Sequence, residues 1–371
     1  MEFLSQLLNL FSNVLTFSWE QGLMILIGAA LIYLAIKKEM EPTLLLPMGF
    51  GAILVNLPGV NVGAIETLFN AGISSELFPL ILFIGIGAMI DFGPLLSNPK
   101  MMLFGAAAQF GIFFTLILAT LFKFPLNDAA SIAIIGAADG PTSIVAAERL
   151  QSNYFGAITV AAYSYMALVP IIQPPFIRLV TTKKERLIRM PYNPTAVTKT
   201  TKILFPIFVT IVAGAVAPES AQLIGFLMFG NLIRECGVLG SLSDTAQNAL
   251  ANIITIFLGF TVSLSMRAGD FVKTETFLIL GLGLVAFIFD TIGGVMFAKF
   301  LNLFTKNKIN PMIGAAGISA FPMSSRVVHK MGLKEDPYNY LLMHAAGANV
   351  SGQIASVLAG GLLMSIVLGW K

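Results

Sequence analysis

Apolar runs long enough to cross a lipid bilayer recur along this chain, and they constrain its fold more than any other feature. Of its 371 residues, 56% are hydrophobic and only 11% are charged, whereas a soluble domain carries about a quarter charged residues. A membrane-spanning helix needs about 20 predominantly apolar residues. The sequence therefore predicts an all-α, polytopic membrane protein. About ten transmembrane helices are expected, near residues 22–37, 43–58, 77–92, 101–122, 156–174, 203–217, 221–235, 248–266, 275–300 and 338–368.

Composition also excludes several classes of function. A net charge of +3 gives no indication of nucleic-acid binding, and the single cysteine, Cys236, excludes an internal disulfide. The two histidines, His329 and His344, are too few for a histidine metal cluster. The chain has no Gly-rich phosphate loop, so we do not expect it to drive transport by hydrolysing ATP itself. Residues 1–17 lack a basic region and a clear cleavage site, so we expect an interfacial helix over 1–21 rather than a secretory signal.

Basic segments set the expected sidedness. Residues 178–202 form a Lys- and Arg-rich linker, which the positive-inside rule places in the cytoplasm together with Lys37, Lys38 and residues 306–308. The number of crossings between Lys38 and the linker returns the chain to the cytoplasm only if residues 129–147 enter and leave the membrane on the same side. We therefore expect a re-entrant hairpin or broken helix pair there, interrupted at Gly140–Pro141. The alternative is an ordinary kinked span together with one miscounted helix.

The two halves of the chain resemble each other. Ile135-Gly136-Ala137-Ala138 recurs 178 positions later as Ile313-Gly314-Ala315-Ala316, and at the same offset 43–58 falls on 221–236. The crossing count gives the two halves opposite orientations, which is the plan of many secondary transporters. We expect a first inverted repeat over 22–177 and a second over 203–371, each carrying one hairpin. The second hairpin is expected at 310–325.

A carboxylate stands inside the first expected hairpin, in the stretch GAADGPTSI. At membrane depth Asp139 is costly unless it faces a cavity or an ion path, and broken backbone is tolerated only in such places. A carboxylate with nearby hydroxyls and carbonyls provides hard oxygen ligands, which suit Na⁺, or H⁺ carried on the carboxyl itself. The alternative is that Asp139 caps a half-helix N-terminus, where negative charge is favoured.

Polar groups also occur in the second half. The run from Asn310 to Lys330 offers Asn310, Ser319, Ser324, Ser325 and Arg326. Ser and Asn can instead simply join helices, and Arg commonly extends to the membrane interface. The pseudo-symmetry of this run with the hairpin that contains Asp139 favours a functional interpretation.

Four further residues within apolar segments are notable. Tyr165 lies in mid-segment, which argues against an interfacial aromatic, and Asn349 is flanked by glycines that are typical of an unwound helix. Asp290 is a second acid that the pattern buries, without an assigned role. His344 is interpreted as a core or interface residue.

Together, GAADGPTSI, AYSYMAL, the spacing of Asn310, Gly314, Ser319 and Arg326, and HAAGANVSG make the chain resemble a known family. This is the β subunit of the biotin-dependent sodium-pumping decarboxylases, which act on oxaloacetate, methylmalonyl-CoA or glutaconyl-CoA. The resemblance covers nearly the whole chain. Its length is similar to that of the compact version in the acyl-CoA decarboxylases.

The resemblance implies a division of labour in a bacterial cytoplasmic (inner) membrane. A carboxyltransferase α subunit would transfer a carboxyl group to biotin on a carrier protein. The β subunit would decarboxylate carboxybiotin and couple this to Na⁺ export with uptake of a proton. A small single-span γ (or δ) subunit and a homo-oligomeric membrane part are also implied. The chain lacks an A-M-K-M biotinylation sequence, as expected if a partner carries the biotin.

By the same resemblance, seven residues match functional positions of the family: Asp139, Tyr165, Asn310, Gly314, Ser319, Arg326 and Asn349. We expect Asp139 with Asn310 and Asn349 to form the main Na⁺ cage. Ser319 and Tyr165 would provide a second ion position and the proton route. Arg326 would hold the carboxylate of carboxybiotin, and Gly314 would allow a close backbone approach.

Two other functions remain open from the residues alone. A secondary Na⁺/H⁺ or Na⁺/organic-anion transporter, without chemistry, has the same composition, repeat and buried carboxylate. A purely structural membrane anchor is the third interpretation, and the costly Asp139 argues against it.

Overall fold

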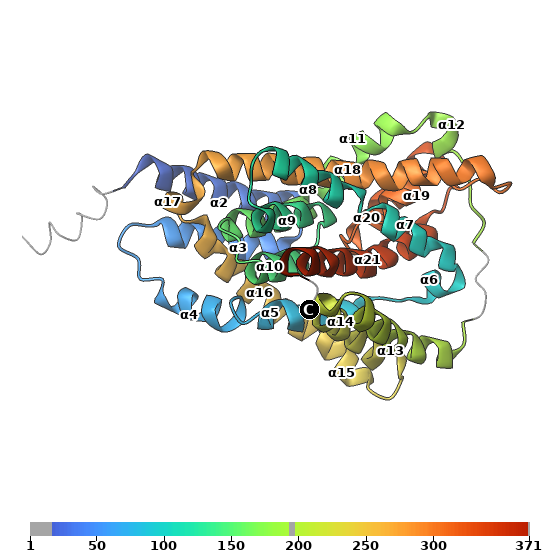
Figure 1. Cartoon of the computed structure of the whole chain (residues 1–371), viewed down its shortest axis with the longest axis horizontal. Coiled ribbons are helices and arrows are strands. Elements are labelled where there is room, and N and C mark those ends of the chain that lie inside the picture. The colour runs from blue at the N-terminus through green and yellow to red at the C-terminus, as the bar shows by residue number, and fades with distance from the viewer. Residues whose placement is uncertain (1–16, 193–196, 370–371) are drawn as a thin grey trace, which may run out of the picture. The chain divides into compact units, whose positions relative to one another are not determined.

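The computed structural model describes residues 17–192 and 197–369, and these residues are helical with no strand (Figure 1). They form two compact units. Unit 1 comprises Met1–Phe78 and Asn252–Leu278, and unit 2 comprises Pro79–Ala251 and Ile279–Lys371. The interfacial helix expected over 1–21 falls mostly on residues 1–16, which lie outside the described residues.

Unit 1 is held together by close helix contacts. It contains α2 (Trp19–Lys38), α3 (Pro42–Asn56), α4 (Gly63–Gly72), most of α16 (Ala251–Ser263) and α17 (Ala268–Phe271). Gly28 of α2 and Gly49 of α3 face each other, and a methyl group on Gly28 would lie 2.7 Å from the Gly49 carbonyl oxygen. Small residues allow such approaches, which replace the hydrophobic effect as a source of helix association in lipid.

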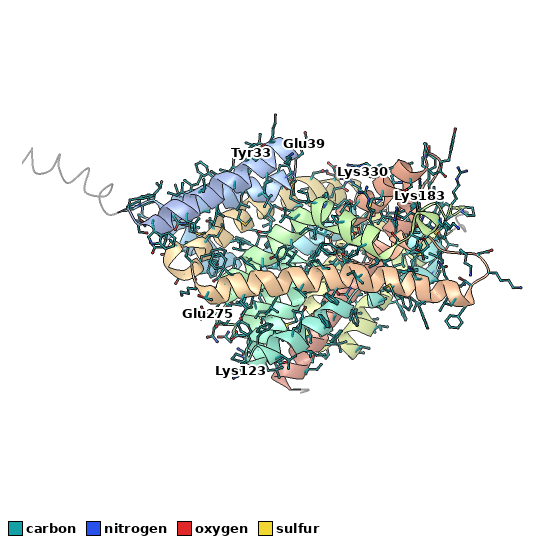
Figure 2. All side chains as sticks on the ribbon, turned by 90° about the horizontal axis from the view of Figure 1, so that it is seen from above. Tyr33, Glu39, Lys123, Lys183, Glu275 and Lys330 are labelled. Atoms are coloured by element: carbon teal, nitrogen blue, oxygen red, sulfur yellow. The ribbon has the colours of Figure 1, made fainter. Side chains whose placement is uncertain are left out.

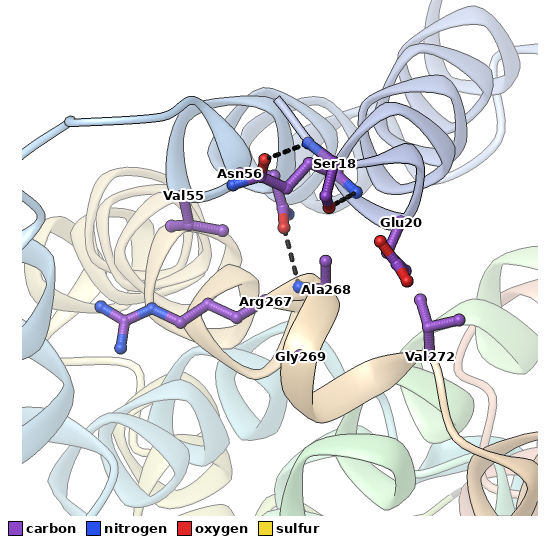
Figure 3. Close-up of a pocket in the computed structure, with 9 residues that line it drawn as sticks. Ser18, Glu20, Val55, Asn56, Arg267, Ala268, Gly269 and Val272 are labelled. Atoms are coloured by element: carbon purple, nitrogen blue, oxygen red, sulfur yellow. Dashed lines mark hydrogen bonds between the residues drawn. The ribbon is translucent and has the colours of Figure 1, made fainter. Parts of the chain in front are cut away.

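Asn56 joins the end of α3 to the start of α17. Its Nδ2 donates to the carbonyl of Met266 at 2.8 Å, and its Oδ1 accepts from the amide of Ala268 at 2.8 Å. Figure 3 shows the contact of Asn56 with Ala268 beside an open pocket of about 550 Å³, which Glu20 and Arg267 also line.

Unit 2 contains most of the chain. Its helices are α5 (Leu77–Met89), α6 (Gly93–Ser97), α7 (Met102–Ala107), α8 (Phe110–Leu121), α9 (Leu126–Ile134), α10 (Gly140–Arg149), α11 (Phe155–Val180), α12 (Lys183–Arg186), α13 (Lys199–Val216), α14 (Ala221–Glu235), α15 (Gly240–Thr245), α18 (Thr274–Phe304), α19 (Met312–Ala315), α20 (Met323–Glu335) and α21 (Leu342–Leu368). The first residues of α5 and α18 belong to unit 1. The most enclosed long helix is α21, with 72% of its most apolar stretch buried, against 17% for α13. Residues on α21 are therefore candidates for an internal site.

The multi-pass character of the chain is confirmed, whereas the number of crossings stays a prediction. Among the described residues, seven helices are long and apolar enough to span a membrane, or eight if the pair α4 and α5, bent by 65°, forms one span. The expected spans 43–58, 77–92 and 221–235 form helices of only 15, 13 and 15 residues. At 1.5 Å per residue, 15 residues cover roughly 22 Å, less than the bilayer core of about 30 Å.

The segment around Asp139 consists of two half-helices whose outer ends touch. We call residues 126–150 hairpin 1; it contains α9, a 3₁₀ turn (Ile135–Ala137) and α10. Nδ2 of Asn127 donates to the carbonyl of Leu150 at 3.2 Å, and Asp128 accepts from the hydroxyl of Ser152 at 2.7 Å. The start and the end of hairpin 1 are therefore tied together.

The second hairpin is tied at its ends to the basic linker. We call residues 310–335 hairpin 2; α20 extends to Glu335, beyond the expected end at 325. Nδ2 of Asn310 donates to the carbonyl of Arg186 at 2.9 Å. At the other end, Glu335 pairs with Arg186 at 2.7 Å and Asp336 with Arg189 at 2.5 Å. Figure 2 shows Lys183 of the basic linker and Lys330 of α20 near each other, apart from Lys123, which precedes hairpin 1.

Candidate functional site

The tips of the two hairpins meet through main-chain and side-chain hydrogen bonds. The amide of Ser319 donates to the carbonyl of Ala137 at 3.1 Å. The hydroxyl of Ser319 donates to Oδ2 of Asp139 at 3.0 Å. The ends of the hairpins are fastened elsewhere, so each hairpin presents its non-helical tip to the other.

Asp139 is buried, and its two carboxylate oxygens accept hydrogen bonds from different parts of the chain. Oδ1 accepts from the amide of Thr142 at 3.2 Å and so caps the N-terminus of α10. Oδ2 accepts from the hydroxyls of Ser319 and Ser356, the latter at 3.1 Å. Capping and a polar site at the hairpin tips are therefore compatible, because each uses a different oxygen.

One face of α21 supplies the third wall. Asn349, Gln353 and Ser356 are spaced by four and three residues, which places them on one side of a helix. Nδ2 of Asn349 donates to the carbonyl of Ile318 at 2.7 Å, and Nε2 of Gln353 donates to Oγ of Ser319 at 2.7 Å. A hydrogen-bonded chain thus runs from Gln353 through Ser319 to Asp139. Sequence reasoning missed Gln353 and Ser356, although their spacing from Asn349 could have indicated them.

Several buried oxygens on hairpin 1, α11 and α21 have no hydrogen-bond partner among the described residues. They are Oγ1 of Thr142, Oδ1 of Asn349, Oε1 of Gln353 and the hydroxyl of Tyr163. A buried polar atom left unpaired costs about 1–3 kcal/mol, so such a group of atoms calls for an explanation. Oxygen ligands suit hard cations, and the described residues hold no cluster of His, Cys, Asp and Glu for a transition metal.

The tyrosines of AYSYMAL point to different neighbours. The hydroxyl of Tyr165 donates to the carbonyl of Leu280 on α18 at 2.5 Å. The ring of Tyr163 instead packs against Gly140, next to Asp139, where an added Cβ would overlap it. The two tyrosines, two positions apart on α11, therefore make different contacts: the hydroxyl of Tyr165 binds α18, and the ring of Tyr163 packs on Gly140 of hairpin 1.

Two residues expected at the site lie elsewhere in unit 2. Asn310 is at the linker end of hairpin 2, where its Nδ2 also binds the carbonyl of Ile188 at 2.9 Å. Gly314 packs backbone to backbone against Gly294 of α18, so that an added Cβ would overlap the Gly294 carbonyl. The structure thus brings Asp139, Ser319 and Asn349 to one cluster but places Asn310 at the linker.

Arg326 lies in the first turn of α20, closer along the chain to the hairpin tip than to the linker end at Glu335. Its side chain is exposed and makes no hydrogen bond or ion pair with the part of the chain that the structure describes. Gln173 of α11, another residue missed from sequence, binds both arms of hairpin 2: it donates to the carbonyl of Ala315 at 2.9 Å and accepts from the hydroxyl of Ser324 at 3.0 Å.

Interrupted helices that meet around a buried, oxygen-lined carboxylate define a class: ion-translocating, multi-pass membrane proteins. Residues 20–367 match the family described as the Na⁺-transporting oxaloacetate decarboxylase beta subunit. The chain belongs to this family and is the membrane subunit of a sodium-translocating decarboxylase.

Curated relatives cover nearly the same length. The chain is 50% identical to the methylmalonyl-CoA decarboxylase subunit beta of Veillonella parvula over 358 residues, covering 96% of this chain and 95% of the relative. It is 48% identical to the glutaconyl-CoA decarboxylase subunit beta of Acidaminococcus fermentans, covering 96% of each. It is 44% identical to the probable oxaloacetate decarboxylase beta chain of Vibrio cholerae, covering 95% of this chain and 96% of the relative.

Proposed function

We propose that this chain decarboxylates carboxybiotin delivered by a partner subunit, and couples this reaction to Na⁺ export with uptake of a proton. The observation that carries the proposal is the contact of Asp139 Oδ2 with two hydroxyls, from hairpin 2 and from α21, in a member of a Na⁺-transporting family. A carboxylate at this junction can exchange a proton for a sodium ion. It can also respond to movement of either neighbouring element.

The Na⁺ site comprises Asp139 and Ser319, with Asn349 supplying an amide oxygen. The amide oxygens of Asn349 and Gln353 support this assignment, because both are buried, lie on the α21 face that contacts hairpin 2 around Ser319, and accept no hydrogen bond from the described residues. Asn310 was expected in the same cage. Its contacts with the linker favour instead a role in holding hairpin 2 to the cytoplasmic segment.

Arg326 binds the carboxylate of carboxybiotin. Its guanidinium is exposed and free of partners among the described residues, and it can make a bidentate contact with a carboxylate. In the reaction the N–carboxylate bond breaks, CO₂ leaves, and the ring nitrogen of biotin takes a proton. Tyr165 belongs to the proton route, and the hydrogen-bonded chain Gln353–Ser319–Asp139 provides the link to the ion site.

The membrane topology proposed here has about ten spans and two re-entrant hairpins in an inverted repeat. The contacts of Asn127 and Asp128 with residues 150–153 support one side for both ends of hairpin 1. The ion pairs of Glu335 and Asp336 with the basic linker support the cytoplasmic side for hairpin 2.

The partners are a carboxyltransferase α subunit, a biotin carrier protein and a small single-span γ (or δ) subunit, around a homo-oligomeric membrane part in the bacterial inner membrane. The names of the relatives support this assembly, since each is a β subunit or β chain of a decarboxylase. Biotin stays on the carrier, and Na⁺ is the transported ion.

The test uses the purified chain in proteoliposomes with free carboxybiotin. We expect decarboxylation stimulated by Na⁺, and we expect Asp139→Asn to abolish both decarboxylation and Na⁺ transport. Ser351→Ala is the control on α21, because among the described residues its hydroxyl binds the carbonyls of Met101 and Ala348 rather than a residue of the site. Asp139→Asn protein that still decarboxylates fully but no longer transports would overturn the coupling. Na⁺ exchange that needs no biotin, without any decarboxylation, would indicate a plain transporter.

A further inference from the structure

Asp290 is a second buried carboxylate in unit 2, and the proposed function does not use it. It lies on α18 and is fully buried. Its Oδ1 accepts hydrogen bonds from the amides of Gly111 and Ile112, at the N-terminus of α8. Its Oδ2 is buried and has no hydrogen-bond partner in the part of the chain that the structure describes.

The unpaired oxygen faces hairpin 1. A Cβ added to Gly136, three residues before Asp139, would lie 2.8 Å from Oδ2 of Asp290 and 2.7 Å from Cβ of Ala286. A Cβ added to Gly111 on α8 would overlap the carbonyl of Ala286. The carboxyl group is therefore inserted between two glycines, one from α8 and one from the turn that leads to Asp139.

The surroundings suit a proton better than a sodium ion. Both amide donors bind Oδ1 and favour negative charge there, but neither reaches Oδ2. An unpaired carboxylate oxygen in a low-dielectric interior is costly. A sodium ion needs several oxygen ligands around it, and the neighbours of Oδ2 on the hairpin side, Gly136 and Ala286, offer no side-chain oxygen. A proton needs only one oxygen, and it removes the charge while Oδ1 continues to accept from both amides.

We propose that Oδ2 of Asp290 is a proton-binding site, which holds a proton in this conformation and exchanges it as hairpin 1 moves during the pumping cycle. The inference rests on the proposed function in one respect, because it assumes that proton movement accompanies Na⁺ export. It adds a second protonatable carboxyl, distinct from Asp139.

Few other titratable groups face this position. The residues of α8 include none. On hairpin 1 the nearest along the chain is Asp139, and on α11 Tyr165 reaches the Leu280 carbonyl of the same helix α18. On α18 itself, Glu275 and Lys299 lie more than two turns away. Asp139 is therefore the group whose charge would be coupled to that of Asp290 through hairpin 1.

The first test compares melting temperatures in detergent at neutral pH. An amide side chain has the shape of a protonated carboxyl, so we expect Asp290→Asn to melt at the native temperature. Asp128→Asn is the matched control. Asp128 is also fully buried, but both its oxygens accept hydrogen bonds, from Ser152 and Asn153. The control should melt lower, by roughly 2–4 °C or more. A similar loss, or a failure to fold, in Asp290→Asn would overturn the proposal.

The second test measures proton movement and Na⁺ transport together in proteoliposomes. We expect Asp290→Asn to lower the number of protons moved per sodium ion and to flatten the pH dependence of the Na⁺-stimulated rate, whereas Asp128→Asn keeps both. A native proton-to-sodium ratio in Asp290→Asn would overturn the inference alone. If Asp290→Asn weakened the apparent Na⁺ affinity and left the proton-to-sodium ratio unchanged, Oδ2 would be a sodium ligand, and the inference would also be overturned. Native protein that moves no protons would overturn the proposed coupling itself.

Discussion

The hydroxyl of Ser319 lies 3.0 Å from Oδ2 of Asp139, although 180 positions separate the two residues in the chain. The contact joins the two hairpin tips, and it is reinforced by the main-chain hydrogen bond from Ser319 to Ala137. The same carboxylate oxygen also accepts from Ser356 of α21. One oxygen atom of hairpin 1 is therefore hydrogen-bonded to hairpin 2 and to α21, so a movement of any of these three elements of unit 2 would change its contacts.

Ser319→Ala and Ser356→Ala should each weaken apparent Na⁺ affinity. Each change removes an oxygen next to Oδ2, and a hydrogen bond to a charged group contributes about 1.5–3 kcal/mol. A weakening of roughly tenfold follows, since each 1.4 kcal/mol is about a factor of ten. The measurement is the Na⁺ concentration for half-maximal decarboxylation. Ser351→Ala, on the same helix, should keep the native value, and an equal effect in all three variants would contradict the site.

Which atoms meet at this site could be predicted only in part. The apolar background and the Gly-Pro break indicated Asp139, because a carboxylate in such a place is costly without a purpose. Ser319 was indicated by the family's spacing. Ser356 and Gln353 were missed because hydroxyl and amide side chains are common on membrane helices. Their contacts depend on how α21 is rotated against hairpin 2, which only the packed structure provides.

Gly294→Ala should destabilise unit 2, whereas Gly281→Ala should not. Both glycines lie on α18, but a Cβ at Gly294 would overlap the backbone of Gly314, and one at Gly281 would meet nothing within 4 Å. Alanine in an open helical position is favoured over glycine by up to about 1 kcal/mol. Melting temperatures in detergent check this, with a decrease for Gly294→Ala and an unchanged or higher value for Gly281→Ala. Equal melting temperatures would contradict the close approach.

The ion pair at the end of hairpin 2 gives a prediction about pH. Hydrogen bonding to Arg189 lowers the pKa of Asp336 below its ordinary value of about 3.9. A carboxyl whose pKa is lowered on folding stabilises the fold above its unfolded pKa, and this contribution is lost as the pH falls through the folded value. The melting temperature of native protein should therefore exceed that of Asp336→Asn near neutral pH, and the difference should shrink below about pH 4. Arg189→Gln should reproduce the effect of Asp336→Asn, and a difference that grows on acidification would contradict the pair.

The number of helices that cross the membrane was harder to predict than their existence. Hydropathy finds apolar segments, but α3 and α14 end after 15 residues, and α5 continues from α4 at a bend of 65°. Length alone therefore does not decide whether these segments cross. The tie between Asn127 and Leu150 at the base of hairpin 1 could not be read from sequence either, since it joins residues 23 positions apart through a loop.

Cysteine labelling can decide whether hairpin 1 is re-entrant. The chain has a single cysteine, so Cys236→Ser provides a background in which one exposed residue at a time is replaced. We expect Lys123→Cys and Gln151→Cys, which flank hairpin 1, to react with a membrane-impermeant maleimide from the same, outer side. Lys330→Cys, on α20 near the basic linker, should react only from the cytoplasmic side (Figure 2).

The contacts at the base of hairpin 1 are the physical reason for this prediction. The two ends of hairpin 1 cannot be hydrogen-bonded to each other and also lie on opposite sides of a bilayer. Labelling of Lys123→Cys and Gln151→Cys from opposite sides would show instead that 129–147 crosses the membrane.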